Sequence, residues 1–247
     1  MIFRALRRAV ALGSVLAFCI PRLWLWRLRG PLTLERRARW GQATGRQMIA
    51  SLGIRIKVTG HPPNGGLLVS NHLSYLDVLI YGTVLPCFFV SKAEIRRWPF
   101  FGWMSRAGGT IYVERSSRSS AISVAEQIAE RLQGPISVLL FPEGTSTDGS
   151  RLLPFRSRLF APAVEAGAPV TAAAIRYVVA DGTPERELCW FGDAAFLPHL
   201  WKALGTPGFS AEVSFGEPQI YPDRRSAAHR TQAEIAALRE CGVLASQ

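Results

Sequence analysis

Cysteine is scarce in this chain, and its four residues stand far apart, at Cys19, Cys87, Cys189 and Cys241. They form no Cys-x-x-Cys pair, and no histidine stands at a spacing that suits zinc. Unpaired thiols are typical of a reducing compartment, so we expect neither a disulfide nor a bound metal.

Two other features are missing, and each absence excludes a class of protein. There is no low-complexity tract, and 48% of the residues are apolar, which excludes a disordered or fibrous protein. There is no Gly-x-Ser-x-Gly elbow, so the usual nucleophile of an α/β-hydrolase is lacking. The 247 residues are enough for one sizeable core, and we expect a single α/β domain.

Acidic side chains are nearly absent from the first 60 residues. This segment holds 12 Lys and Arg residues and a single carboxylate, Glu35, so it accounts for the whole formal charge of +11. The rest of the chain is balanced, which argues against a nucleic-acid groove there. We therefore expect the basic segment to meet an anionic membrane surface.

An apolar run at 9–20 follows the first arginines and ends at Pro21. As a helix it would extend about 18 Å, well short of the roughly 30 Å hydrocarbon core of a bilayer. Trp24 and Trp26 stand among further arginines, which is typical of a membrane interface. We expect 1–52 to form a basic amphipathic helix or helical hairpin in the cytoplasmic leaflet, held by arginines at about 1 kcal/mol each.

Two other interpretations of this segment are open. A secretory signal has an Arg-rich start and an apolar stretch of this length, but no small-x-small cleavage site follows, and Pro21 interrupts the place where one is needed. A core helix with a solvated basic edge is the second alternative.

Strand and helix patterns alternate along the rest of the chain. Expected strands are 54–58, 67–70, 87–91, 110–113, 137–141, 170–177 and 211–215, with a further candidate at 188–191. Expected helices are 34–51, 75–83, 119–133, 159–166, 197–204 and 226–240. The alternation predicts an α/β domain over 53–247, with a mostly parallel central sheet flanked by helices.

His72 follows the apolar strand at 67–70, in the segment Asn-His-Leu-Ser-Tyr-Leu-Asp that ends at Asp77. Histidine is a base near neutral pH, and a carboxylate five residues on can fix its tautomer. Such a pair can activate an alcohol for attack on a thioester without a serine or cysteine nucleophile. Ser74 and Asp77 also match a helix capping box, and this alternative is compatible because a cap would hold Asp77 near His72. His61, His199 and His229 have no carboxylate at that spacing, and we expect them to be structural.

Phe-Pro-Glu-Gly-Thr-Ser, at 141–146, follows the strand at 137–141. A loop of this kind can bring backbone amides and a carboxylate to a polar ligand, although Pro and Gly also punctuate ordinary turns. Arg115 follows the strand at 110–113, and its planar guanidinium suits a phosphate, although a surface salt bridge would use it equally. Because ligands gather at the carboxyl ends of parallel strands, His72, Arg115 and Glu143 are expected to share one site.

An aromatic segment, Trp-Pro-Phe-Phe-Gly-Trp-Met at 98–104, is flanked by basic residues. Three interpretations of this segment are open: it forms the wall of an acyl channel, it inserts into the membrane interface, or it is part of the core.

In their order and spacing, these motifs resemble those of the glycerolipid acyltransferase family, which includes 1-acyl-glycerol-3-phosphate acyltransferases. The resemblance spans 54–215. It implies that His72 is the base and Asp77 its orienting partner. It also implies that the acceptor phosphate and head group are bound at Arg115, Glu143, Gly144 and Thr145. The family's fourth motif usually has two prolines; here Pro169 is present and Ala172 stands at the second position.

The resemblance implies an O-acyltransferase without a cofactor or metal, whose acyl donor is acyl-CoA or acyl carrier protein. The first candidate acceptor is 1-acyl-sn-glycerol-3-phosphate, which gives phosphatidic acid. The second is a lyso-ornithine lipid, for which Arg115 would matter less. A non-catalytic membrane-binding module and a thioester hydrolase are further alternatives. The expected location is the cytoplasmic face of the inner membrane, peripheral or monotopic, with no nucleic-acid partner.

Overall fold

The computed structural model describes residues 1–114, 118–179 and 181–244. Within them, seven strands form one sheet in the order β1-β7-β6-β2-β5-β3-β4. The strands are β1 (Ile54–Thr59), β2 (Leu67–Ser70), β3 (Cys87–Lys92), β4 (Ile111–Val113), β5 (Ser137–Leu140), β6 (Val170–Val179) and β7 (Phe209–Phe215). Neighbouring strands in these ranges are parallel, except for the antiparallel pair β6 and β7. The predicted, mostly parallel sheet is confirmed.

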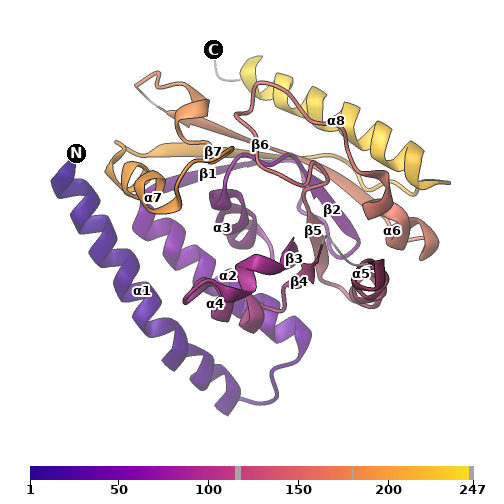
Figure 1. Cartoon of the computed structure of the whole chain (residues 1–247), viewed down its shortest axis with the longest axis horizontal. Coiled ribbons are helices and arrows are strands. Elements are labelled where there is room, and N and C mark those ends of the chain that lie inside the picture. Colours follow the sequence, from indigo (N-terminus) through magenta and orange to yellow (C-terminus); the bar gives the residue numbers. More distant parts are fainter. Residues whose placement is uncertain (115–117, 180, 245–247) are drawn as a thin grey trace.

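Helices cover both faces of the sheet (Figure 1). One face carries α1 (Ile2–Leu28), α2 (Leu34–Leu52), α3 (Tyr75–Val84), α4 (Phe101–Gly108) and α7 (Phe196–Gly205). The other carries α5 (Arg118–Leu132), α6 (Ala161–Glu165) and α8 (Arg224–Leu244). Three short 3₁₀ helices within the described ranges, η1 (Ala93–Arg97), η2 (Ser157–Phe160) and η3 (Glu185–Glu187), lie in the connections.

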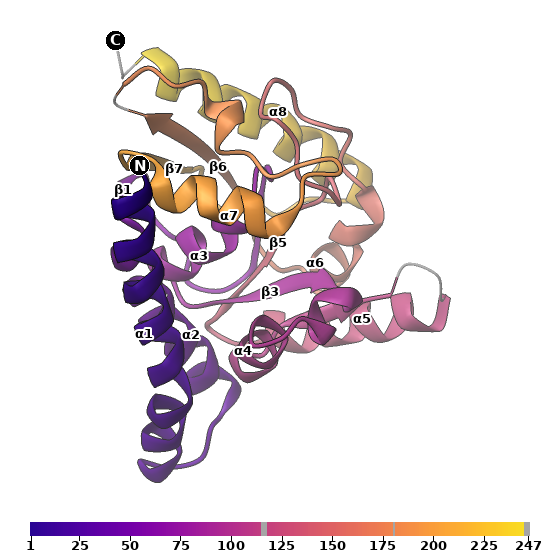
Figure 2. The ribbon, with the colours of Figure 1, turned by 60° about the vertical axis from the view of Figure 1, so that its left-hand side comes forward.

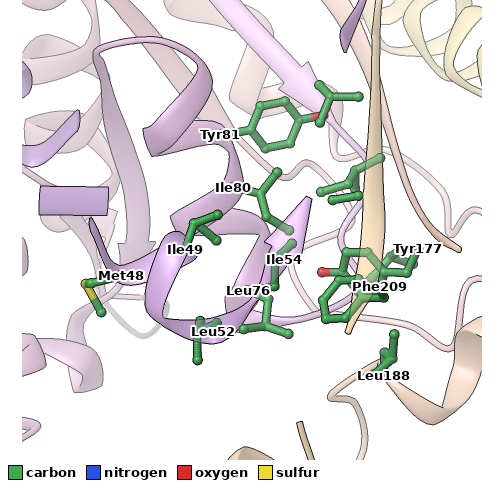
Figure 3. Close-up of a cluster of buried hydrophobic side chains, with 14 of the residues drawn as sticks. Met48, Ile49, Leu52, Ile54, Leu76, Ile80, Tyr81, Tyr177, Leu188 and Phe209 are labelled. Atoms are coloured by element: carbon green, nitrogen blue, oxygen red, sulfur yellow. The ribbon is translucent and has the colours of Figure 1, made fainter. Parts of the chain in front are cut away.

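The central strands β2 and β5 are short and mostly apolar because both of their faces are buried, and each contains one buried serine, Ser70 or Ser137. Leu68 faces the α2 and α3 layer, whereas Leu67 and Val69 face the α5 and α8 layer. Figure 3 shows the first of these cores, where Ile49 of α2 and Ile80 of α3 are among the buried side chains. Burial of each such side chain contributes about 1.5–3 kcal/mol.

The helix α2 ends at Leu52, one residue beyond the predicted range of 34–51, and Gly53, with a φ of 69°, forms its C-cap. Two other expectations need correction. The expected strand at 188–191 is wrong: Leu188 and Cys189 are buried, but they lie in a turn after η3 and pair with no strand. The helix expected at 159–166 is split into η2 and the shorter α6, which has a proline in its first turn.

The helix α1 continues through Pro21 without a break, so it is longer than the apolar run at 9–20. Its 27 residues extend about 40 Å, rather than the 18 Å of the apolar run alone. Among the described residues, α1 is the one helix whose length and composition would allow it to cross a membrane. Signal sequences meet the same criteria. The helix α1 lies along the outside of the molecule (Figure 2) and exposes apolar side chains such as Phe18 and Trp24.

Two arginines join α1 to the end of α7. The buried Arg8 donates to the carbonyls of Leu204 and Thr206, at 3.1 and 2.8 Å, and Arg4 donates to the carbonyl of Gly205. These are the carbonyls that a helix leaves without partners at its C-terminus, where positive charge is favourable. The first 52 residues therefore pack against the sheet domain, and their expected status as a separate segment stays a prediction.

Candidate active site

The loop after β2 is held in place by Asn71. Its side-chain oxygen accepts from the backbone N–H of Ile175 at 2.9 Å, and its amide nitrogen donates to the carbonyl of the same residue at 3.1 Å. Asn71 is buried and makes the two bonds that a neighbouring strand residue would make with β6. The next residue, His72, therefore leaves the sheet in a fixed direction.

Asp77 lies beside His72, as predicted. Its Oδ2 accepts from His72 Nδ1 at 2.7 Å and from the backbone N–H groups of Leu73 and Ser74, at 2.7 and 3.0 Å. The capping box at the start of α3 is also formed, so Asp77 makes the cap and the contact with His72 at the same time, and the catalytic role of the pair stays a prediction. The carboxylate is fully buried, and these donors offset the cost of removing its charge from water.

The two ring nitrogens of His72 differ in their surroundings. Its Nδ1 contacts Asp77, and the ring stacks on Phe141 at a centroid distance of 4.0 Å and an interplanar angle of 13°. The side chain is 21% exposed and forms part of a cavity wall. Nε2 is therefore the ring atom that remains for a substrate.

The cavity beside His72 has a volume of about 640 Å³ and a largely apolar wall. It lies among α2, α3, β3 and α4, and its wall includes Met48, Leu79, Phe89, Trp98, Phe101 and Met104. Three of these side chains come from the aromatic segment at 98–104, which was expected to line a channel, to lie in the interface or to be core. Such a volume is ordinary for a small-molecule site.

Glu143 lies under the His72 loop and does not form part of the cavity wall. One carboxylate oxygen accepts from the N–H of His72 and the other from the N–H of Leu153, both at 2.9 Å. The side chain is buried, and burial raises the pKa of its carboxyl group. Contact between Glu143 and an acceptor stays a prediction, since its carboxylate already holds two loops together.

Gly144, Thr145 and Ser146 do line the cavity. Gly144 has a φ of 73°, and a Cβ there would lie 2.7 Å from Cζ of Arg156, so a side chain at 144 would meet the guanidinium. Arg156 is itself exposed and forms part of the same wall. Arg115, predicted to bind the phosphate, lies outside the described residues.

Known proteins resemble the chain in sequence. An acyltransferase family model matches residues 55–176. A lyso-ornithine lipid O-acyltransferase of Pseudomonas aeruginosa is 37% identical over 185 residues, which cover 74% of this chain and 70% of the relative. A 1-acyl-sn-glycerol-3-phosphate acyltransferase of Neisseria meningitidis is 36% identical over 176 residues, 69% of this chain and 68% of the relative.

The chain belongs to the acyltransferase family. The fold of this acyltransferase is also found in the crystal structure of the 1-acyl-sn-glycerophosphate acyltransferase PlsC from Thermotoga maritima. The TM-score is 0.71 at 18% identity, over 97% of this chain and 95% of the other. The similarity extends to the full α/β domain and the N-terminal helices.

Sequence reasoning missed two residues of the acyltransferase site. Arg156 stands ten residues beyond the Phe-Pro-Glu-Gly-Thr-Ser motif, and nothing in the pattern distinguishes it from the other basic residues. Tyr177 lies in the strand expected at 170–177, and its hydroxyl donates to Oδ1 of Asp77. A tyrosine at the end of an apolar strand is an ordinary core residue by sequence, so its polar contact gave no signal.

Proposed function

We propose that this acyltransferase moves a fatty acyl group from a thioester donor to the free hydroxyl of a lyso-lipid. The observation that carries the proposal is His72 itself, held through Nδ1 by a buried Asp77 and placed at the wall of an apolar cavity. The base and its orienting carboxylate are the parts that alcohol activation requires.

In the proposed reaction, Nε2 of His72 takes the proton of the acceptor hydroxyl as its oxygen attacks the thioester carbonyl. Asp77 stabilises the imidazolium that forms. The tetrahedral intermediate then loses the thiolate as the C–S bond breaks, and the imidazolium returns the proton to the sulfur. The products are an ester and a free thiol, without a covalent acyl-enzyme. The donor is proposed to be acyl-CoA or acyl carrier protein, with the acyl chain in the cavity.

The acceptor is proposed to carry an anionic head near Gly144, where the Arg156 guanidinium lies at the cavity wall. Arginine suits phosphate and carboxylate because its planar fork bonds both oxygens. The first candidate is 1-acyl-sn-glycerol-3-phosphate. A lyso-ornithine lipid is the second, supported by the 37% identity to the Pseudomonas aeruginosa relative and by 35% identity to a lyso-ornithine lipid O-acyltransferase of Rhodobacter capsulatus.

The protein is proposed to act at the cytoplasmic face of the inner membrane, peripherally or monotopically. The exposed apolar side chains of α1, with the arginines near its two ends, support this location. Apolar area and attraction to anionic lipid both favour an interface.

The test is an acyl-transfer assay in detergent or vesicles, with labelled acyl-CoA and labelled acyl carrier protein as donors. Lysophosphatidic acid and lyso-ornithine lipid are offered separately, with His72→Ala as the control. Diacyl product that the variant fails to make supports the proposal and identifies donor and acceptor. Free fatty acid released without acceptor would indicate a hydrolase. No product from either acceptor would favour a membrane-binding module, and equal product from the variant would refute the assignment of His72 as the base.

A further inference from the structure

Asp77 has two carboxylate oxygens, and they meet different partners. Oδ2 serves His72 and the start of α3, whereas Oδ1 accepts from the hydroxyl of Tyr177, 100 residues later in β6. Both side chains are buried, Asp77 completely and Tyr177 to 97%. We propose that Tyr177 is a positioning residue for acyl transfer, which orients the Asp77 carboxylate toward His72 and takes up part of its negative charge.

The position of Tyr177 is fixed by contacts of its ring and of its backbone. Its ring packs against Phe209 of β7 at a centroid distance of 5.1 Å, and both side chains are visible in Figure 3. Its backbone N–H donates to Oε1 of Glu185 at 2.7 Å, and Oε2 of Glu185 accepts from Arg239 of α8 at 2.8 Å. Arg239 also donates to the carbonyl of Ile175. These contacts fix the backbone of β6 at Tyr177, so its phenol has little freedom to move and restricts the orientation of the Asp77 carboxylate.

The phenol is a permanent donor in this place. Burial and the charge of Asp77 raise the pKa of Tyr177 well above its ordinary value, so the hydroxyl stays protonated wherever the enzyme works. A buried carboxylate oxygen without a donor would carry an uncompensated desolvation cost. A donor on Oδ1 also draws charge from Oδ2, which weakens the stabilisation of the His72 imidazolium. Tyr177 therefore favours the neutral base that alcohol activation requires.

Other ionisable groups lie around Asp77 and Tyr177, and all of them except Tyr81, which the control variant changes, stay the same in the comparison below. They come from every element packed against the pair: Tyr81 in α3, Glu143 and Asp148 after β5, Glu185 in η3, Cys189 after it, and Arg239 in α8.

The test compares Tyr177→Phe with Tyr81→Phe, and it rests on the proposed acyl transfer. Tyr81 is a matched control because its hydroxyl is equally buried and loses one hydrogen bond, to Ser70 Oγ at 2.6 Å, without contacting Asp77. For Tyr177→Phe we expect kcat to fall about 10- to 100-fold with KM unchanged, and the acid limb of the pH–rate profile to move to higher pH. For Tyr81→Phe we expect only a lower midpoint of urea unfolding.

A second readout does not depend on activity. In protein labelled with ¹⁵N-histidine, His72→Gln assigns the His72 signal, and Tyr177→Phe raises the pH midpoint of its titration. If Tyr177→Phe does not fold, 3-fluorotyrosine placed at position 177 keeps the hydroxyl as a stronger donor, and the midpoint then moves to lower pH. A wild type that acylates no lyso-lipid would refute the proposed function, while this titration still tests the positioning role.

The inference is overturned if the His72 titration midpoint is the same with tyrosine and phenylalanine at position 177, or with fluorotyrosine there. It is equally overturned if Tyr81→Phe lowers kcat and moves the acid limb as far as Tyr177→Phe does.

Discussion

The backbone N–H of His72 donates a hydrogen bond of 2.9 Å to the buried carboxylate of Glu143. The carbonyl of His72 in turn accepts from the N–H of Thr147 at 2.9 Å. The loop after β2 and the loop after β5 are therefore joined on both sides of the histidine. Two motifs that stand 71 positions apart form one structural unit.

Replacing Glu143 with alanine tests this junction. The change leaves the N–H groups of His72 and Leu153 without their acceptor, and each buried donor left unpaired costs about 1–3 kcal/mol. We expect a lower free energy of unfolding by urea and a lower kcat, since the His72 backbone loses its support. A variant as stable and as active as the wild type would contradict this role.

The same variant has a defined pH dependence. Burial raises the pKa of Glu143 above its usual value of 4.5, so the folded protein binds the Glu143 proton more tightly than the unfolded chain does. This contribution to the free energy of unfolding is fully present below pH 4.5 and is lost as the pH rises through the raised pKa. The difference in unfolding free energy, wild type minus Glu143→Ala, is therefore expected to decrease over that window. A urea series between pH 4 and pH 8 measures it, and a difference that grows with pH would refute the assignment.

Replacing Asp77 with asparagine removes the charge but keeps the shape. The amide oxygen can still accept from the N–H groups of Leu73 and Ser74, so the cap of α3 is expected to persist. The imidazolium loses its partner, and kcat is expected to fall by about 10² to 10⁴. Urea unfolding verifies that the variant is folded. Retention of kcat within about tenfold would show that Asp77 serves the cap alone.

Replacing Asn71 with aspartate tests the two hydrogen bonds that the Asn71 side chain makes with the backbone of Ile175 in β6. One carboxylate oxygen can still accept from the N–H of Ile175, but the other would face its carbonyl oxygen, which accepts the amide proton of Asn71 in the wild type. We expect a loss of about 1–3 kcal/mol in unfolding free energy. Urea unfolding of Asn71→Asp at neutral pH measures the loss. An unchanged free energy of unfolding would mean that these two hydrogen bonds do not stabilise the loop.

Replacing Arg156 with alanine tests the proposed head-group contact. For lysophosphatidic acid we expect KM to rise about 10- to 100-fold, the effect of losing one or two charge-assisted hydrogen bonds. Arg158 is the matched control, because it is exposed nearby and forms no part of the cavity wall. Equal effects of Arg156→Ala and Arg158→Ala on KM would assign the effect to overall charge.

The sequence predicts the fold well where local patterns decide it. The strands β2 and β5 are recognisable because burial on both faces leaves only one polar residue, a serine, in each. The pairing of His72 with Asp77 is also local, since the two residues are five positions apart and the capping box with Ser74 holds the Asp77 carboxylate at the start of α3. The sequence therefore predicts the centre of the site.

Contacts between distant residues could not be predicted in this way. Leu188 is apolar because it covers the core, and the same pattern suggested a strand. The length of α1 beyond the apolar run at 9–20 could not be predicted either, because α1 packs against α2 and its Arg8 bonds to the end of α7. The partners of Glu143 and Tyr177 lie 71 and 100 residues away, and only the fold brings them together.

The central claim is that His72 is the base for acyl transfer, and the initial rate of diacyl-lipid formation tests it most directly. The measurement compares the wild type with His72→Gln and with His61→Gln, whose histidine is exposed and forms no part of the cavity wall. We expect His61→Gln to match the wild type and His72→Gln, folded by urea unfolding, to lose about 10² to 10⁴ in rate. A folded His72→Gln enzyme that forms diacyl lipid at the wild-type rate would contradict the account.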